Sequence, residues 1–129
     1  MKLLLDTHIL LWAASDPQCL SEGTQALLLD PGNKLFFSVV SLWEIVMKKG
    51  LGRDDFSVDP QRLRRLLIAN GYTELSVLAE HVLHLDRLPA LHKDPFDRLL
   101  IAQAQTEAML LITVDGMVIQ YKDAVLAAT

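Results

Sequence analysis

The chain has 129 residues, enough for one domain with a core of its own, and 51% of them are hydrophobic, which excludes a disordered protein. A net charge of −4 argues against a protein that coats nucleic acid with a wholly basic surface, although it is compatible with an acidic centre inside a basic rim. The single cysteine, Cys19, rules out an internal disulfide and is typical of the reducing cytoplasm.

The first residues, MKLLLDTHILLW, resemble a secretory signal, but Asp6 interrupts the apolar run and no small-residue cleavage site follows. No apolar run approaches the roughly 20 residues that a bilayer-spanning helix needs. Residues 2–6 instead predict a short buried strand, followed by the helical spacing of THILLWAA and a second helix capped by Ser21. We therefore expect a soluble, cytoplasmic protein without contact to a membrane.

Residues 34–40, KLFFSVV, are rich in aromatic and β-branched side chains and predict the next strand. The segment after it, SLWEIVMKKG, predicts a helix in which Ser41 and Glu44 have the spacing of a capping box. A polar, turn-rich connection, LGRDDFSVDP, follows. Glu44 would then lie in the first turn of its helix.

The middle of the chain continues the alternation of helices and strands. Pro60 opens the amphipathic helix QRLRRLLIANG, and YTELS is short enough for a minor strand. VLAEHVLHLDRLP then predicts a helix that ends before Pro89. No repeat, low-complexity tract or flexible linker is present, so we expect residues 1–129 to form one domain.

Residues 92–105, HKDPFDRLLIAQAQ, predict a core helix with two aspartates at its start. Asp94 is a good N-cap, Pro95 fits the first helical position, and Asp97 falls at the third, where a carboxylate faces free amides and the positive end of the helix dipole. AMLLITVD predicts a further buried strand that ends in Asp115, and the tail predicts a last short strand around Ala124 to Leu126.

Short apolar strands that alternate with helices predict an α/β fold with a parallel sheet covered on both faces. In such a sheet, ligands gather beyond the carboxyl ends of the strands, where the following helices begin. Four acids are expected at that edge because each ends a strand or begins a helix: Asp6, Glu44, Asp97 and Asp115.

Each of these acids also has an ordinary structural explanation. Asp6 fits a helix cap, Glu44 fits a capping box, Asp97 suits the dipole of its helix, and Asp115 with Gly116 forms a turn dipeptide. Four carboxylates in one cleft repel one another, however, and a cation between them relieves that repulsion. Hard oxygen ligands with few histidines favour Mg²⁺ or Mn²⁺ over Zn²⁺, so a metal site competes with capping as the explanation.

Other candidate sites are weaker. The chain contains no Gly-rich phosphate loop and no nucleophile elbow. His81 and His84 stand three residues apart on one predicted helix, where we expect surface or half-buried positions because a zinc site needs more ligands. His92 precedes the Asp94 cap and is close enough in sequence to approach the cleft, although a loop histidine is more often structural or exposed.

Two kinds of side chain are assigned to structural positions. Trp12 and Trp43 fall on the apolar faces of predicted helices and are expected in the core. Several basic residues near the acidic segments are expected on solvated faces: Lys48, Lys49, Arg53, Lys93 and Arg98.

Four segments in series, LLLDTHILLW, SVVSLWEIVMKKGLG, LPALHKDPFDRLLIAQA and LLITVD, resemble the PIN domain family, specifically the VapC-like toxins of bacterial type II toxin–antitoxin systems. The resemblance covers nearly the whole chain, with the motifs in the family's order. It implies a three-layer α/β/α sandwich with a mostly parallel sheet. It also implies that the family's catalytic acids correspond to Asp6, Glu44, Asp97 and Asp115, with Thr113 as a hydroxyl beside the site.

The resemblance further implies a Mg²⁺- or Mn²⁺-dependent endoribonuclease, dimeric and inhibited by a small antitoxin whose tail enters the cleft. The apolar helices and the LGRDDF segment also favour a homodimer, because a monomer of this size hides so much hydrophobic surface with difficulty. A signalling receiver domain is the less suitable reading, because Asp6 stands alone after its strand and the later strand ends lack a suitable lysine. A PIN-like regulator that binds RNA or a partner without cleaving it remains the alternative.

Overall fold

A five-stranded sheet with all neighbouring strands parallel forms the centre of the computed structural model, which describes residues 1–121 and 125–127. The strand order is β3-β2-β1-β4-β5. The central strand β1 pairs Leu4 with Phe36 on one side and with Leu111 on the other. The predicted parallel sheet is thereby confirmed, with strands at these bounds: β1 Lys2–Leu5, β2 Lys34–Ser38, β3 Thr73–Leu75, β4 Leu110–Thr113 and β5 Val125–Ala127.

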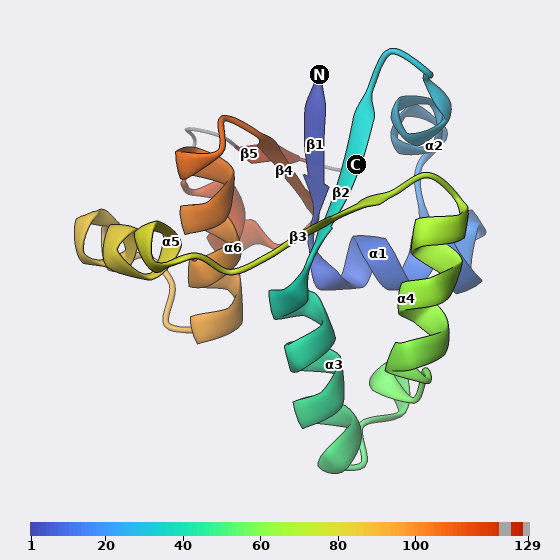
Figure 1. Cartoon of the computed structure of the whole chain (residues 1–129), viewed down its shortest axis with the longest axis horizontal. Coiled ribbons are helices and arrows are strands. Elements are labelled where there is room, and N and C mark those ends of the chain that lie inside the picture. The colour runs from blue at the N-terminus through green and yellow to red at the C-terminus, as the bar shows by residue number, and fades with distance from the viewer. Residues whose placement is uncertain (122–124, 128–129) are drawn as a thin grey trace.

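Helices cover both faces of the sheet, as the predicted α/β/α sandwich requires (Figure 1). Figure 1 shows α1, α2 and α4 on one side and α5 and α6 on the other. The α-helices have these bounds: α1 Thr7–Ser15, α2 Glu22–Leu29, α3 Val39–Gly50, α4 Pro60–Ala69, α5 Ala79–His84, α6 Pro95–Thr106 and α7 Gly116–Ile119. Three single-turn 3₁₀ helices connect them: η1 Pro17–Cys19, η2 Asp54–Phe56 and η3 Leu85–Arg87.

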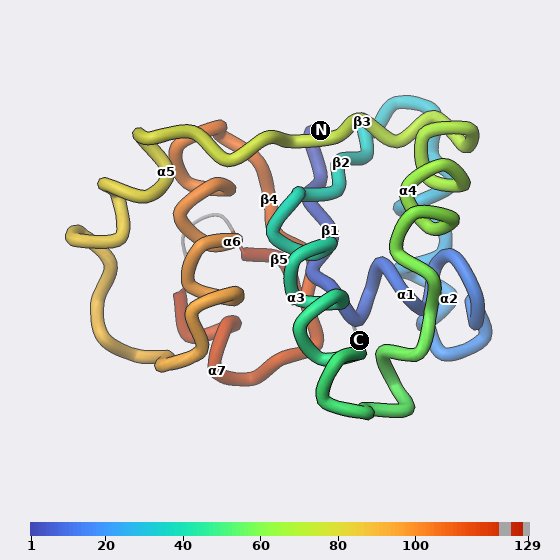
Figure 2. The backbone as a smooth tube through the Cα atoms, turned by 60° about the horizontal axis from the view of Figure 1, so that its bottom comes forward, coloured from blue at the N-terminus to red at the C-terminus, as the bar shows by residue number. Residues whose placement is uncertain are grey.

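Two apolar clusters, one on each face of the sheet, hold these layers together. Successive residues of a strand point to opposite faces, so Leu3 and Leu5 pack with α1 and α4, whereas Leu4 packs with α6. Helix α3 contributes to both clusters, through Ile45 to the first and Val40 to the second. Figure 2 shows α3 between the helices of the two layers. Because α3 follows β2 directly, it begins at the carboxyl end of that strand.

The junction between β2 and α3 differs from its prediction. The strand ends at Ser38 rather than at residue 40, because the Ser38 hydroxyl accepts a hydrogen bond from the Val40 amide (3.0 Å) and caps the helix there. The expected capping box of Ser41 and Glu44 is therefore wrong, and Glu44 lies in the second turn of α3 instead of the first. From this position Glu44 contacts Thr7, the first residue of α1.

Three further expectations about burial or extent are corrected. Trp43 is 49% exposed rather than in the core, since its ring packs edge-on against Phe96 at the surface (centroids 4.6 Å apart). His81 is fully buried rather than at the surface. The helix expected from VLAEHVLHLDRLP is α-helical only in α5 and ends in η3, although it stops before Pro89 as predicted.

The last predicted strand is present as β5, while Ala124, its expected first residue, lies outside the described residues. Trp12 is half-buried and packs against the first apolar cluster. None of the helices in the described part of the chain has the length and apolar character to cross a membrane.

Candidate active site

Asp6 follows β1 and caps α1. Its Oδ1 accepts a hydrogen bond from the Ile9 amide (2.9 Å), and its Oδ2 accepts one from the Thr113 hydroxyl at the end of β4. Burial raises the pKa of Asp6, while the hydrogen bonds from Thr113 and Ile9 oppose that rise. The capping explanation is therefore correct for one oxygen only, because the other is held by a residue of the neighbouring strand.

Glu44, 3% exposed, lies beside Asp6 through a short chain of contacts. Its Oε1 accepts a hydrogen bond from the Thr7 hydroxyl (2.6 Å), and Thr7 is the residue directly after Asp6. Its Oε2 pairs with the Lys48 ammonium one helical turn further along α3. Glu44 thus enters the site with one oxygen oriented by a neutral donor and the other by a cation.

Lys48 departs from the expected solvated position. Its side chain is only 19% exposed, and its Nζ lies 4.9 Å from the centroid of the Phe56 ring and 5.8 Å from that of Phe96. Two aromatic faces and a carboxylate therefore hold this cation in place. It balances the charge of Glu44 at the rim of the acid cluster.

Asp94 and Asp97 divide the start of α6 between them as predicted. Asp94 Oδ1 accepts hydrogen bonds from the amides of Phe96 (2.9 Å) and Asp97 (3.1 Å), so Asp94 is the cap. Asp97 is not used as a cap, and its Oδ2 lies 2.8 Å from His92 Nε2. Burial, together with the nearby charges of Asp94 and Glu44, raises the pKa of Asp97 to about 7.

Asp115 follows β4 and is the most open of the four acids. Its Oδ1 caps α7 by accepting from the amides of Met117 (2.8 Å) and Val118 (3.4 Å). Its own amide donates to the Thr113 hydroxyl oxygen (3.0 Å), the same hydroxyl that donates to Asp6. Thr113 therefore links two of the acids through one oxygen atom.

The structure places all four predicted acids around the carboxyl ends of β1, β2 and β4, but in two groups. Asp97 and Asp115 form a tight group with His92, in which one ligand atom from each residue lies within 4.8 Å of the others. Asp6 and Glu44 stand outside that distance limit. Glu44 is electrostatically coupled to that group, since its charge adds to the effect of burial on the pKa of Asp97, and it acts in the same direction on the pKa of Asp6.

His92 is the residue of this group that sequence reasoning did not assign to the site. The one available signal was its position two residues before the Asp94 cap, which places it near the mouth of α6. Its Nε2 lies 2.8 Å from Asp97 Oδ2 and 3.7 Å from Asp115 Oδ2. Only the folded chain shows that its ring enters the gap between these two carboxylates.

The donor set fits a hard divalent cation. Oxygen atoms from four carboxylates are the ligands that Mg²⁺ and Mn²⁺ prefer. Burial, and then the charges of the neighbouring carboxylates, raise the pKa of Asp97, and a bound cation would favour its ionised form. The acids thus have both the chemistry and the electrostatic need for such an ion.

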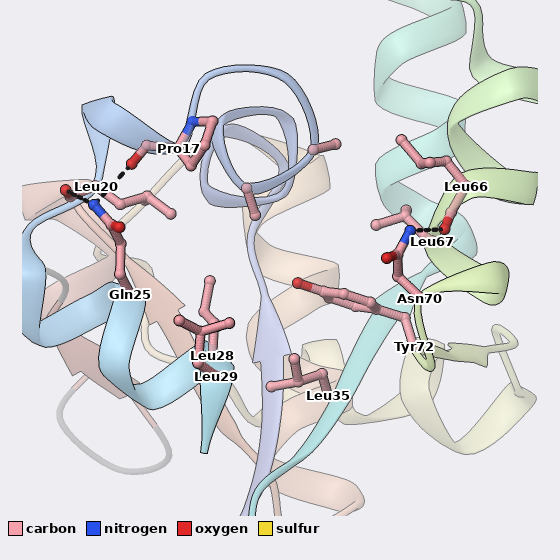
Figure 3. Close-up of a pocket in the computed structure, with 12 residues that line it drawn as sticks. Pro17, Leu20, Gln25, Leu28, Leu29, Leu35, Leu66, Leu67, Asn70 and Tyr72 are labelled. Carbon is pink, nitrogen blue, oxygen red and sulfur yellow. Dashed lines mark hydrogen bonds between the residues drawn. The ribbon is translucent and has the colours of Figure 1, made fainter. Parts of the chain in front are cut away.

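One pocket of the described structure lies away from the acid cluster. It has a volume of about 380 Å³ and is lined by apolar residues of α1, α2 and α4, with the Tyr72 ring at one side (Figure 3). No carboxylate or histidine is among the residues lining it in the described structure. The chemistry of the acid cluster, rather than the depth of a cavity, therefore marks the candidate site.

Comparisons with known proteins place these observations in a family. A model of the PIN domain matches residues 3–125. No significant match was found among curated proteins by sequence. Three solved structures are similar in fold: VapBC2 from Rickettsia felis bound to promoter DNA (17% identity, TM-score 0.69, 100% of both chains), VapBC-1 from nontypeable Haemophilus influenzae (20%, 0.63, 98% of this chain and 96% of that one) and a toxin–antitoxin complex from Klebsiella pneumoniae (24%, 0.64, 96% and 95%).

Proposed function

The chain belongs to the PIN domain family, and from this premise we propose that it is a divalent-metal-dependent endoribonuclease, the toxin of a toxin–antitoxin pair. The observation that carries the proposal is the meeting of Asp97 and Asp115 beside Asp6 and Glu44 at the carboxyl edge of the sheet. Enzymes that hydrolyse phosphodiesters with the help of metals use such clusters of carboxylates. The proposed substrate, RNA, would be met in the cytoplasm.

Asp6, Glu44, Asp97 and Asp115 would hold Mg²⁺ or Mn²⁺. The bound ion would activate water and offset negative charge on the phosphoryl group. The protein's own part is to orient the ligands before the ion arrives: the hydroxyl of Thr113 fixes one oxygen of Asp6, and that of Thr7 fixes one oxygen of Glu44. Binding also requires Asp97 to be ionised, and its raised pKa leaves it partly protonated near pH 7 until a cation binds.

An antitoxin is the proposed protein partner. Support comes from the names of similar structures, VapBC2, VapBC-1 and a toxin–antitoxin complex, in which a chain of this fold belongs to a toxin–antitoxin assembly. We expect the antitoxin to inhibit cleavage by covering the acid cluster.

A second copy of the chain is the other proposed partner. Large apolar side chains are exposed on α3 and around α5, including Trp43, Val46, Met47, Val82 and Leu83. We infer from these exposed side chains, which a second copy could cover, that the protein forms a homodimer. Sedimentation at micromolar concentration should give the mass of two chains, and a monomer would contradict this part of the proposal.

The direct test is incubation of the purified protein with mixed RNA in Mg²⁺, in Mn²⁺ and in chelator. We expect cleavage with either ion and none with chelator. Calorimetry should show binding of the same ions without RNA. Metal and RNA binding without any cleavage would favour the alternative, a PIN-fold regulator, whereas no ion binding at millimolar concentration would remove the metal site itself.

A further inference from the structure

The loop around His92 indicates which nitrogen of the neutral imidazole ring carries the proton. Its Nδ1 accepts a hydrogen bond from the Asp94 amide (3.3 Å), so the lone pair of Nδ1 is in use. The neutral ring must therefore carry its proton on Nε2, the atom that faces Asp97 and Asp115. His92 presents a hydrogen-bond donor to the acid cluster.

That donor makes no hydrogen bond, although a carboxylate lies near it. Nε2 is the one buried side-chain nitrogen or oxygen, within residues 1–121 and 125–127, that makes no hydrogen bond. The 2.8 Å contact with Asp97 Oδ2 is close enough but lacks hydrogen-bond geometry, so the N–H is not directed at that oxygen. A buried donor without an acceptor is unfavourable, and such a group in a native site calls for an acceptor that arrives later.

The ring is also held in place by its loop. The Tyr121 hydroxyl accepts hydrogen bonds from the amides of Leu91 (3.1 Å) and His92 (3.0 Å) and donates to the Pro89 carbonyl (2.6 Å). Arg98 donates to the His92 carbonyl (3.3 Å) from the first turns of α6. These contacts fix the loop backbone on both sides of His92 before any ligand binds, and the Asp94 amide contacts the ring itself, which is the preorganisation that a binding group requires.

A role as metal ligand conflicts with this arrangement. To bind an ion, Nε2 would need its lone pair, and the proton would move to Nδ1. Nδ1–H would then face the Asp94 N–H, placing two donors against each other. The ligand that suits Nε2–H is an acceptor, and the acceptor that a cation held by the carboxylates would attract is a phosphate oxygen.

We propose that His92 binds a phosphate oxygen of the RNA through its Nε2–H and remains outside the ligand shell of the metal. This inference rests on the nuclease function proposed above. It assigns His92 to the positioning of the substrate, with the carboxylates left to hold the ion.

A pair of substitutions separates the two nitrogen atoms of the ring. His92→Asn keeps an acceptor near the Asp94 amide but places nothing at the position of Nε2. His92→Gln extends an amide N–H to about that position. His84→Gln is the matched control, because His84 is a part-buried histidine of α5 whose Nε2 contacts Gln105 Oε1 (2.7 Å) and none of the four acids.

Two measurements are needed for each variant: Mn²⁺ affinity without RNA, and single-turnover cleavage as a function of protein concentration. For His92→Asn we expect Mn²⁺ affinity within about twofold of wild type and cleavage efficiency lowered about 10- to 100-fold, with a higher half-saturating concentration, as expected for losing one hydrogen bond to a charged group. His92→Gln should recover a large part of that loss. His84→Gln should behave as wild type.

Different results overturn different statements. A tenfold or greater loss of Mn²⁺ affinity in both His92 variants would make His92 a metal ligand and overturn the inference. Unchanged cleavage per folded molecule in His92→Asn, with or without a lower melting temperature, would leave His92 with a structural role only. A wild-type protein that neither binds nor cleaves RNA would overturn the proposed function and this inference together, and that result is visible in the wild-type sample alone.

Discussion

The surroundings of His81 and His92 differ although both rings are held in the same way. In each, Nδ1 accepts a backbone N–H, from Leu78 for His81 (3.0 Å) and from Asp94 for His92 (3.3 Å), and Nε2 faces a carboxylate. His81 Nε2 makes a hydrogen bond with Glu107 (2.7 Å), whereas His92 Nε2 makes none. Both ring nitrogens of His81 therefore take part in hydrogen bonds, whereas only Nδ1 of His92 does.

The hydrogen-bond network around His81 includes Gln103, whose Nε2 lies 3.3 Å from His81 Nδ1. Gln103 of α6 is fully buried; its Oε1 accepts from the Ser38 hydroxyl (2.5 Å) and its Nε2 donates to the Ser76 carbonyl (3.2 Å). Glu80, His81 and Glu107 also have ligand atoms within 4.8 Å of one another. Because both ring nitrogens of His81 already have partners, we assign this group to structure.

Helix α6 contributes residues both to the His81 network and to the acid cluster beside His92. Its first turn carries Asp97 with a raised pKa, and its middle carries Gln103 with its polar atoms paired. Satisfied polar groups in a core stabilise a fold, while gathered like charges destabilise it until a ligand binds. Substitutions in the two regions should therefore affect different properties.

The largest expected effect is on catalysis at the acid cluster. Asp97→Asn is nearly isosteric but removes a charge that the metal needs, so cleavage should fall at least ~100-fold while the protein stays folded. Asp94→Asn is the matched control, because asparagine caps a helix as well as aspartate does. Cleavage rates and thermal melts of the two variants decide the matter. Normal activity in Asp97→Asn and loss in Asp94→Asn would reverse the two assignments.

The next effect is on stability in the His81 network. Gln103→Leu conserves volume but leaves the buried Ser38 hydroxyl without its acceptor, which should lower the free energy of unfolding by about 2–3 kcal/mol. Cleavage per folded molecule should stay within about threefold of wild type. Urea unfolding gives the first quantity. The control is Gln105→Leu at a part-buried position of the same helix, where under about 1 kcal/mol is expected.

A third test uses pH to detect the effect of burial and of the neighbouring carboxylates on Asp97. With a folded-state pKa of about 7 against 3.8 for an ordinary aspartate, the folded protein holds a proton that the unfolded chain releases. This contribution to stability is present at pH below 3.8 and is lost as pH rises through 7. After allowance for partial exposure we expect a loss of about 1–2 kcal/mol across this window.

The measurement is urea unfolding in chelator between pH 4.5 and 7.5 for wild type and Asp97→Asn. The difference between the two free energies should change with pH, because the variant lacks the titrating carboxyl group. Added Mg²⁺ should reduce the loss in wild type near pH 7. Parallel curves would show that Asp97 in the acid cluster titrates like an ordinary aspartate, against our inference.

The smallest predicted effect concerns the link between Asp6 and Asp115. Thr113→Val removes the donor to Asp6 and the acceptor for the Asp115 amide, so Mg²⁺ affinity should fall about fivefold and stability by about 1 kcal/mol. Thr106→Val, which removes a hydroxyl that only bonds back to carbonyls of its own helix, should leave affinity unchanged. Equal affinities for both variants would show that Asp6 needs no help in holding its orientation.

Local sequence signals determined the order of helices and strands and the positions of most helix caps. Asp94, Pro95 and Asp97 occupy the positions at the start of α6 that their residue types predict, because a cap is a contact between residues two or three apart. The gathering of the four acids at one edge also followed from sequence, since parallel strands and the helices after them share that edge.

Only the tertiary structure decided which polar side chains have hydrogen-bond partners and which do not. The contacts that distinguish them join distant positions: Thr113 and Asp6 are 107 residues apart, and Ser38 and Gln103 are 65 apart. Burial of His81, exposure of Trp43 and the approach of His92 to Asp97 depend on neighbours of this kind. A residue's own sequence neighbourhood does not specify them, because side-chain environment is set by the elements that pack against it.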